Sequence, residues 1–136
     1  MIVDTSALVA VLREENGWRP LYTTLCDEPG LIIAPVLVEL GRVTAQANNR
    51  PSQAARDLLS LLTGYRITFI PFRVDTGLAA AAANERYGSG NGRGGKLNML
   101  DLMVYATAIE TGLPILCTGK DFAATDALIH PASRIG

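Results

Sequence analysis

The stretch that decides the fold is MIVDTSALV, residues 1–9, in which the apolar run Met1–Val3 gives way to Asp4-Thr5-Ser6 and then to a second apolar run. Ile and Val favour a buried strand, whereas Asp, Thr and Ser side chains accept hydrogen bonds from the free N–H groups at the start of a helix. The stretch therefore predicts a strand that passes directly into a helix at Asp4. In an open α/β sheet, ligands bind at the carboxyl ends of the strands, which is where Asp4 would lie. Taken alone, however, an acidic residue at such a junction is most simply a helix cap.

Length and composition narrow the class of protein. The 136 residues are 49% hydrophobic and 18% charged, which is typical of a single globular domain spanning residues 1–136. No apolar run approaches the roughly 18 residues needed to cross a membrane, and Asp4 interrupts what would be the apolar region of a signal peptide. The sequence therefore predicts a cytoplasmic protein with no membrane segment.

The cysteines, the histidine and the net charge exclude several functions. Cys26 and Cys117 are far apart and His130 is the single histidine, so neither a disulfide framework, nor a zinc cluster, nor a two-histidine ribonuclease is indicated. His130 precedes Pro131, and we expect the pair in a surface turn. Because the net charge is only −1, a nucleic acid would have to meet a local basic patch of the protein.

Predicted strands and helices alternate along the chain. Short apolar runs predict buried strands at residues 1–3, 31–34, 67–70 and 115–117, with a last short strand around 127–129. Helices are expected at residues 5–15, 18–27, 35–49, 53–63, 74–87 and 99–110, with a turn at 48–52 and Asn98 as the cap of the last helix. Short apolar strands separated by helices favour an α/β fold, with a central parallel sheet of four to five strands between two layers of helices.

Three further acidic residues lie near predicted strand ends or in the first turns of helices. Glu39 is in the second turn of a helix, where the simpler interpretation is an i,i+3 ion pair with Arg42. Asp101 is in the first turn of the most apolar helix, where it could form a capping box with Asn98. Asp121 follows the fourth predicted strand, where it could be another cap.

Together with Asp4, these acids would converge on one edge of a parallel sheet. Crowded carboxylates stay ionised only if a cation lies among them. Oxygen ligands without His or Cys select Mg²⁺ or Mn²⁺, and such ions activate water for the hydrolysis of phosphodiester bonds. The four acids therefore predict nuclease chemistry.

The runs MIVDTSALVAVL, VLVELGRV and KLNMLDLMVYATAIETGLPILCTGKDF, with Thr125-Asp126 behind them, resemble a PIN domain, specifically a VapC-type toxin ribonuclease of a toxin–antitoxin pair. The resemblance covers nearly the whole chain. It implies Mg²⁺ or Mn²⁺ held at four acidic positions, matched by Asp4, Glu39, Asp101 and Asp121, and supporting polar positions matched by Thr5, Ser6, Thr118 and Asp126. It also implies a 3-2-1-4-5 strand order with Asp4 on the middle strand, a homodimer, an RNA substrate and a small antitoxin that blocks the site. One departure is Leu100, where the family often has Gly in the pattern Leu-Asn-x-Gly-Asp.

Residues 88–95 contain five glycines and predict a flexible loop. GNGRGGK at residues 90–96 matches part of a phosphate-binding P-loop, but a P-loop follows a strand, whereas a helix is expected here. We interpret the segment as a basic loop that brings Arg86, Arg93 and Lys96 near RNA phosphates, or equally as a solvated connector.

Two rival classes of protein fit parts of the pattern. An aspartyl-phosphate phosphatase would need a second Asp two residues after Asp4, where this chain has Ser6. The alternative that stays open is a catalytically inactive PIN-like module that binds RNA or protein. All four acidic positions are filled, which argues against it.

Overall fold

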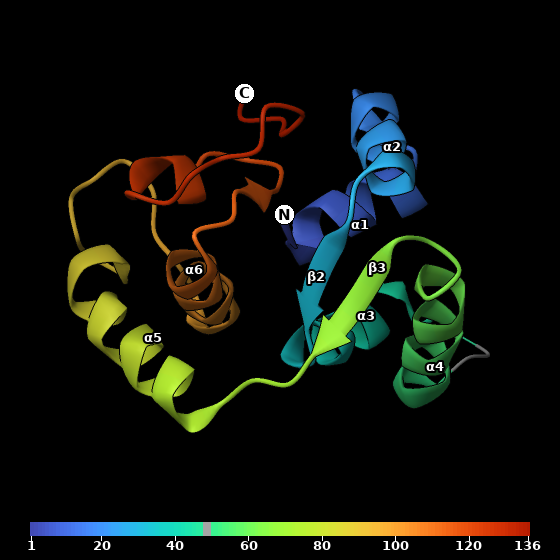
Figure 1. Cartoon of the computed structure of the whole chain (residues 1–136), viewed down its shortest axis with the longest axis horizontal. Helices are drawn as coiled ribbons and strands as arrows, with labels where there is room; N and C mark the ends of the chain where they lie inside the picture. Colours follow the sequence, from blue (N-terminus) through green and yellow to red (C-terminus); the bar gives the residue numbers. More distant parts are fainter. Residues whose placement is uncertain (48–49) are drawn as a thin grey trace.

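The computed structural model of the chain describes residues 1–47 and 50–136 (Figure 1). Its centre is a parallel sheet with the strand order β3-β2-β1-β4, formed by β1 (Ile2–Val3), β2 (Gly30–Ile33), β3 (Ile67–Ile70) and β4 (Ile115–Leu116). Ile2 pairs with Leu31 on one side and with Ile115 on the other, so β1 lies in the middle of the sheet. The predicted position of Asp4 directly after a central strand is confirmed. The predicted fifth strand is reduced to a single parallel bridge between Ile129 and Ile115.

Helices form a layer on each face of this sheet. The described helices are α1 (Thr5–Leu12), α2 (Trp18–Asp27), α3 (Pro35–Thr44), α4 (Pro51–Leu62), α5 (Val74–Tyr87), α6 (Met99–Thr111) and the short 3₁₀ helix η1 (Phe122–Ala124). Right-handed crossovers require α1 to α4 on one face and α5 with α6 on the other, because the chain reverses direction across the sheet after β3. Figure 1 shows α5 and α6 side by side on the left, away from α3 and α4. The fold is the predicted three-layer α/β/α arrangement.

The core fills the space between these layers. The strand residues Ile2, Val3, Ile32, Ile115 and Leu116 have no exposed surface. Their apolar side chains are buried on both faces of the sheet, as is usual for parallel strands. Within residues 1–47 and 50–136, no helix is both long and apolar enough to cross a membrane.

Several predicted boundaries are wrong. α4 begins at Pro51, inside the predicted turn and two residues before its predicted start, and β2 covers Gly30–Ile33 instead of residues 31–34. α1 stops at Leu12, well before residue 15, because Glu14 (φ 49°) and Gly17 (φ 82°) take left-handed backbone conformations that end a helix. α3 stops at Thr44, since Ala45 is extended; the predicted end near residue 49 and part of the turn at 48–52 lie outside the described residues. Cys117 is buried but is not part of β4.

The expectation for His130 is partly confirmed: the Ser133 N–H donates to the His130 oxygen at 2.9 Å and closes a turn over Pro131-Ala132, but His130 itself does not lie at the surface. The side chain is buried, and its Nε2 lies 2.9 Å from a carboxylate oxygen of Glu28. The His130 Nδ1 accepts a hydrogen bond from the backbone N–H of Ala132 at 3.1 Å, so Nε2 carries the proton that Glu28 accepts. His130 therefore fastens the C-terminal segment to the end of α2.

Candidate active site

Asp4 lies at the carboxyl end of β1 and is also the N-cap of α1. Its Oδ2 accepts hydrogen bonds from the backbone N–H of Ser6 at 2.9 Å and from the Ser6 hydroxyl. The Ser6 Oγ in turn accepts the backbone N–H of Thr118 at 3.0 Å, which links Asp4 to the segment that follows β4. The carboxyl group is buried, and this burial raises its pKa; the hydrogen bonds from Ser6 partly offset the increase, and the charge of Glu39 adds to it.

Asp101 lies in the first turn of α6 and forms the capping box that the sequence predicts. Its Oδ2 accepts the Asn98 N–H at 2.9 Å, while its own N–H donates to Asn98 Oδ1 at 2.9 Å. The pKa of Asp101 is nevertheless raised to about 7. Burial is the main cause, and the negative charges of Asp4, Asp121 and Glu39 raise it further.

The charges that act on Asp101 and on Cys117 indicate where the site lies. The acids that raise the pKa of Asp101 come from three other segments: Asp4 from the end of β1, Glu39 from α3, and Asp121 from the turn after β4. The buried thiol of Cys117, next to the end of β4, has its pKa raised to about 11 mainly by burial, with additions from Asp4 and Asp101. The four predicted acids therefore share one negative region at the carboxyl edge of the sheet.

Glu39 and Asp121 stand at the periphery of this region. Glu39 is half-buried and lines a hollow of about 590 Å³ together with Leu100, which occupies the position where the family often has Gly. None of the ion pairs in the described residues joins Glu39 to Arg42, so the simpler interpretation of Glu39 finds no support. Asp121 is exposed and precedes η1, but its side chain makes no capping hydrogen bond there.

The donor set matches a hard divalent cation in its chemistry. Asp4 and Asp101 each hydrogen-bond through Oδ2, and Asp121 through Oδ1, so in the described residues each carboxylate has a second oxygen outside these bonds. The Thr5 hydroxyl, beside Asp4, is the one buried side-chain oxygen or nitrogen of the described residues without a hydrogen-bond partner. As the side chains stand, however, no three acids, histidines or cysteines in residues 1–47 and 50–136 are grouped so that they could hold a metal ion. An ion would have to draw the half-buried Glu39 or the exposed Asp121 inward.

The predicted supporting residues divide into two groups. Thr5, Ser6 and Thr118 lie around Asp4, as described above. Asp126 instead accepts hydrogen bonds from two tyrosines, Tyr105 at 2.6 Å and Tyr87 at 3.0 Å. The tyrosines carry no motif in the sequence, and 39 residues separate Tyr87 from Asp126, so sequence spacing gave no signal of this contact.

The glycine loop lies against the acidic turn. Lys96 N–H donates to Asp121 Oδ1 at 3.2 Å, and a Cβ at Gly95 would lie 3.1 Å from the Asp121 Cα, so a larger residue there would push Asp121 back by a few tenths of an ångström. A hollow of about 290 Å³ is lined by the loop, including Arg93 and Lys96, and by Asp121. The element before the loop is the helix α5, so the P-loop interpretation fails as expected. The lining of this hollow thus includes both basic and acidic residues.

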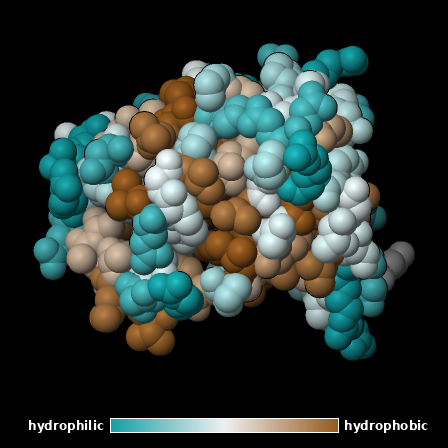
Figure 2. Space-filling model, in the orientation of Figure 1, coloured by the Kyte–Doolittle hydropathy of each residue, from teal (hydrophilic) through white to brown (hydrophobic). Residues whose placement is uncertain are grey.

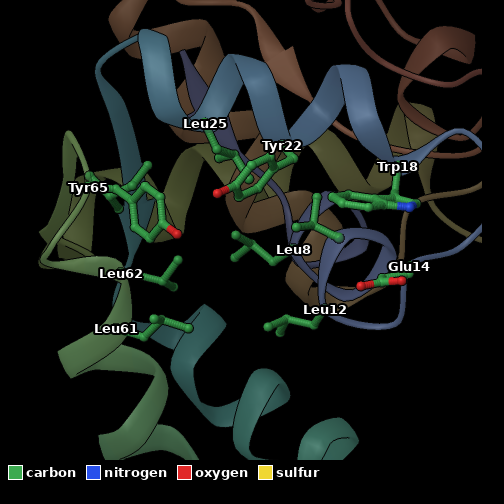
Figure 3. Close-up of a pocket in the computed structure, with 11 residues that line it drawn as sticks. Leu8, Leu12, Glu14, Trp18, Tyr22, Leu25, Leu61, Leu62 and Tyr65 are labelled. Atoms are coloured by element: carbon green, nitrogen blue, oxygen red, sulfur yellow. The ribbon is translucent and has the colours of Figure 1, made fainter.

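A separate apolar groove lies on the α1–α4 side of the sheet. It has a volume of about 390 Å³, and Figure 3 shows its side chains converging from α1, α2, α4 and the segment before β3. Leu12, Tyr22 and Leu61 are 41% to 50% exposed there, which is unusual for large apolar side chains. None of the four acids lines this groove.

The fold and the site define an α/β domain with an acidic centre at the carboxyl edge of a parallel sheet. The profile of the PIN domain family matches residues 1–128, and the chain belongs to this family. It is 40% identical over 133 residues to Ribonuclease VapC42 of Mycobacterium tuberculosis, an alignment that covers 97% of this chain and 98% of the relative.

Solved structures share the fold at low sequence identity. VapC20 of Mycobacterium tuberculosis, described as a toxin that cleaves the sarcin–ricin loop, superposes with a TM-score of 0.73 at 15% identity, covering 93% of this chain and 95% of that one. A toxin–antitoxin complex from Klebsiella pneumoniae superposes with a TM-score of 0.69 at 18% identity, covering 96% of each chain.

Proposed function

We propose that residues 1–136 act as one metal-dependent endoribonuclease domain, the toxin of a type II toxin–antitoxin pair. The observation that carries the proposal is Asp101, whose pKa is raised to about 7 by burial and by the charges of Asp4, Asp121 and Glu39. A site that gathers this much negative charge in partly buried surroundings is suited to a cation. The 40% identical relative carries the name ribonuclease, which supports RNA as the substrate. The place of action that we propose is the cytoplasm.

Mg²⁺ or Mn²⁺ fits the all-oxygen donor set. Asp4 and Asp101 would hold the ion, with Glu39 and Asp121 as the further ligands. A bound ion of this kind supplies an activated water and stabilises the charge that develops on a phosphate. The protein itself contributes orientation: Ser6 holds the Asp4 carboxylate through two hydrogen bonds, and Asn98 holds that of Asp101.

RNA would approach from the side of the glycine loop. Arg86, Arg93 and Lys96 are exposed there, and Lys96 is next to Asp121 through its backbone. With a net charge of only −1 spread over the chain, these local cations are what would attract the RNA backbone. They would contact phosphates without reading bases.

The apolar groove of Figure 3 is our candidate for the antitoxin contact. Its exposed leucines and tyrosine suit a helix that presents an apolar face, with side chains spaced one helical turn apart. A helix seated between α1, α2 and α4 could place its flanking chain near Asp4, since Asp4 is the N-cap of α1. The fold it shares with a known toxin–antitoxin complex is consistent with such a partner.

A second apolar surface supports a homodimer. Val38 of α3, Val74 and Leu78 of α5, and Met99 of α6 are 70% to 84% exposed. Figure 2 shows apolar surface at the lower left of the view, over the first turns of α5. Burying these side chains against a second copy would remove about 0.8 kcal/mol of unfavourable hydration per methylene group.

The test is cleavage of structured and unstructured RNA by the purified chain with Mg²⁺, with Mn²⁺ and with EDTA. We expect cleavage only with metal, and none from Asp101→Asn under any condition. Cleavage that persists in EDTA would refute the metal site. RNA binding without cleavage under every metal condition would identify the chain as the inactive PIN-like binding module instead.

A further inference from the structure

Asp126 is held by two buried phenols. Tyr105 and Tyr87 both donate to its Oδ1, at 2.6 Å and 3.0 Å, and their rings pack edge to face with centroids 5.2 Å apart. Tyr105 lies in α6 and Tyr87 is the last residue of α5, whereas Asp126 follows η1. One exposed carboxylate therefore fixes the relative positions of three segments.

The ring of Tyr87 also carries two cations. The guanidinium carbons of Arg86 and Arg93 lie 5.0 Å and 5.5 Å from its centroid. Arg93 Nε donates to the backbone oxygen of Arg86 at 3.2 Å, which ties the glycine loop to the end of α5. Two like charges that contact one ring repel each other, and the attraction between each cation and the electron-rich ring offsets this repulsion.

Asp126 strengthens this arrangement in two ways. Its charge is near enough to Arg86 for that arginine to lower the pKa of Asp126, although the hydrogen bonds from Tyr105 and Tyr87 contribute more. A phenol that donates to a carboxylate also has a more electron-rich ring, which binds cations more strongly. The acids that raise the pKa of Asp101 are Asp4, Asp121 and Glu39, so the acidic centre has its own charges apart from Asp126.

We propose that Asp126 is a positioning residue for RNA binding: through Tyr87 and Tyr105 it holds Arg86 and Arg93 on one ring as a preformed site for the phosphates of RNA. The inference rests on the proposed ribonuclease function and assigns Asp126 to substrate binding instead of to support of the acidic centre. We call the five residues Arg86, Tyr87, Arg93, Tyr105 and Asp126 the arginine clamp. Its two arginines are exposed, while both tyrosines are buried.

The test compares Tyr87→Phe and Asp126→Asn with the wild type. Tyr87→Phe keeps the ring and removes its hydroxyl, and Asp126→Asn keeps an acceptor oxygen and removes the charge. We expect each variant to raise KM for RNA by about two- to fivefold, with kcat within twofold of the wild type. RNA affinity measured in EDTA, where no cleavage occurs, should fall by the same factor. The rise in melting temperature caused by Mn²⁺ should not change.

A double-mutant cycle connects these residues to the arginines. Arg93→Ala should weaken RNA binding and reduce its salt dependence by about one phosphate contact. In the Tyr87→Phe background the same substitution should cost less, because Arg93 is already held less firmly by the ring that lacks its hydroxyl. Arg19→Ala is the matched control, since the Arg19 guanidinium lies 5.5 Å from the centroid of the Trp18 ring on α2. It should change neither the RNA affinity nor the salt dependence of that affinity.

Distinct results overturn the inference and the proposed function. If Asp126→Asn lowers kcat and the stabilisation by Mn²⁺ while RNA affinity stays the same, Asp126 supports the acidic centre and the clamp is refuted. Unchanged KM and affinity in Tyr87→Phe, or fully additive effects in the cycle, would refute it as well. A wild-type protein that binds RNA but does not cleave it with Mg²⁺ or Mn²⁺ would contradict the ribonuclease proposal alone, because the affinities in EDTA still report on the clamp.

Discussion

Asp101→Asn in metal-free protein tests whether the carboxylates are crowded. Asn keeps an oxygen that can accept the N–H of Asn98, so the capping box at the start of α6 loses little. The charge that faces Asp4, Asp121 and Glu39 is removed. We therefore expect the variant to be inactive and yet more stable than the wild type above neutral pH in EDTA.

The magnitude follows from the pKa of Asp101, which is about 7 in the folded chain against an ordinary value of 3.8. Because the folded state holds this proton more tightly, the contribution of Asp101 to stability is complete below pH 3.8 and is lost as pH rises to about 7. A shift of about 3 pKa units corresponds to roughly 4 kcal/mol. Water reaches part of this carboxyl group and screens it, so we expect on the order of 2 kcal/mol, or roughly 7 °C in melting temperature for a domain of this size.

The assay is thermal unfolding of both proteins in EDTA from about pH 4 to pH 8.5, with Asp57→Asn on the exposed face of α4 as the control. The melting temperatures of wild type and Asp101→Asn should coincide near pH 4 and separate as pH rises, whereas the control should follow the wild type throughout. A hundredfold excess of Mn²⁺ over its dissociation constant would then stabilise the wild type by about 2.7 kcal/mol and the variant by much less. If the variant melts below the wild type by a constant amount at every pH, Asp101 is a structural cap and the crowding argument fails.

Three further predictions concern other parts of the molecule. Asp4→Asn should abolish RNA cleavage while its melting temperature in EDTA equals or exceeds that of the wild type; a lower melting temperature combined with an undiminished gain from Mn²⁺ would make Asp4 a cap only. Ser6→Ala should lower kcat and cost about 1–2 kcal/mol of stability, because it leaves the Thr118 N–H without its acceptor; unfolding and cleavage assays showing no change would contradict this. Leu61→Asp should weaken binding of an antitoxin peptide at least about tenfold by calorimetry while cleavage of RNA stays normal, and unchanged binding would place the partner elsewhere.

The elements that the sequence predicts well are those with strong local signals. α2 and α5 begin and end where predicted, and β3 does as well, because apolar runs and Gly or Pro mark their limits. α1 and α3 end early because their ends depend on backbone conformations at Glu14 and Ala45, which the continuing apolar pattern does not reveal. The order of the strands came from the resemblance to a family, and the sheet confirms it for β1 to β4.

Long-range partners could not be predicted from spacing. His130 is buried because Glu28 lies across from it, 102 residues away in sequence. Asp126 contacts Tyr87 and Tyr105 because α5, α6 and the C-terminal segment pack together. In each case a polar side chain is held by a residue that no local motif connects to it.

Capping and metal binding are compatible roles for the acids of this site. A cap fixes one carboxylate oxygen on the N–H groups at the start of a helix, as Asp4 does at α1 and Asp101 at α6 through Oδ2. In the described residues the Oδ1 of Asp4 and the Oδ1 of Asp101 take part in none of these bonds. Because each Oδ2 is held by the cap, the direction of the Oδ1 on the same carboxyl group is also fixed. In the proposed metal site the cap would thus orient a ligand oxygen, and a bound cation would offset the unfavourable burial that raises the pKa of both carboxyl groups. Asp4, which follows β1, and Asp101, which follows the glycine loop, would then serve the fold and the proposed site with the same carboxyl groups.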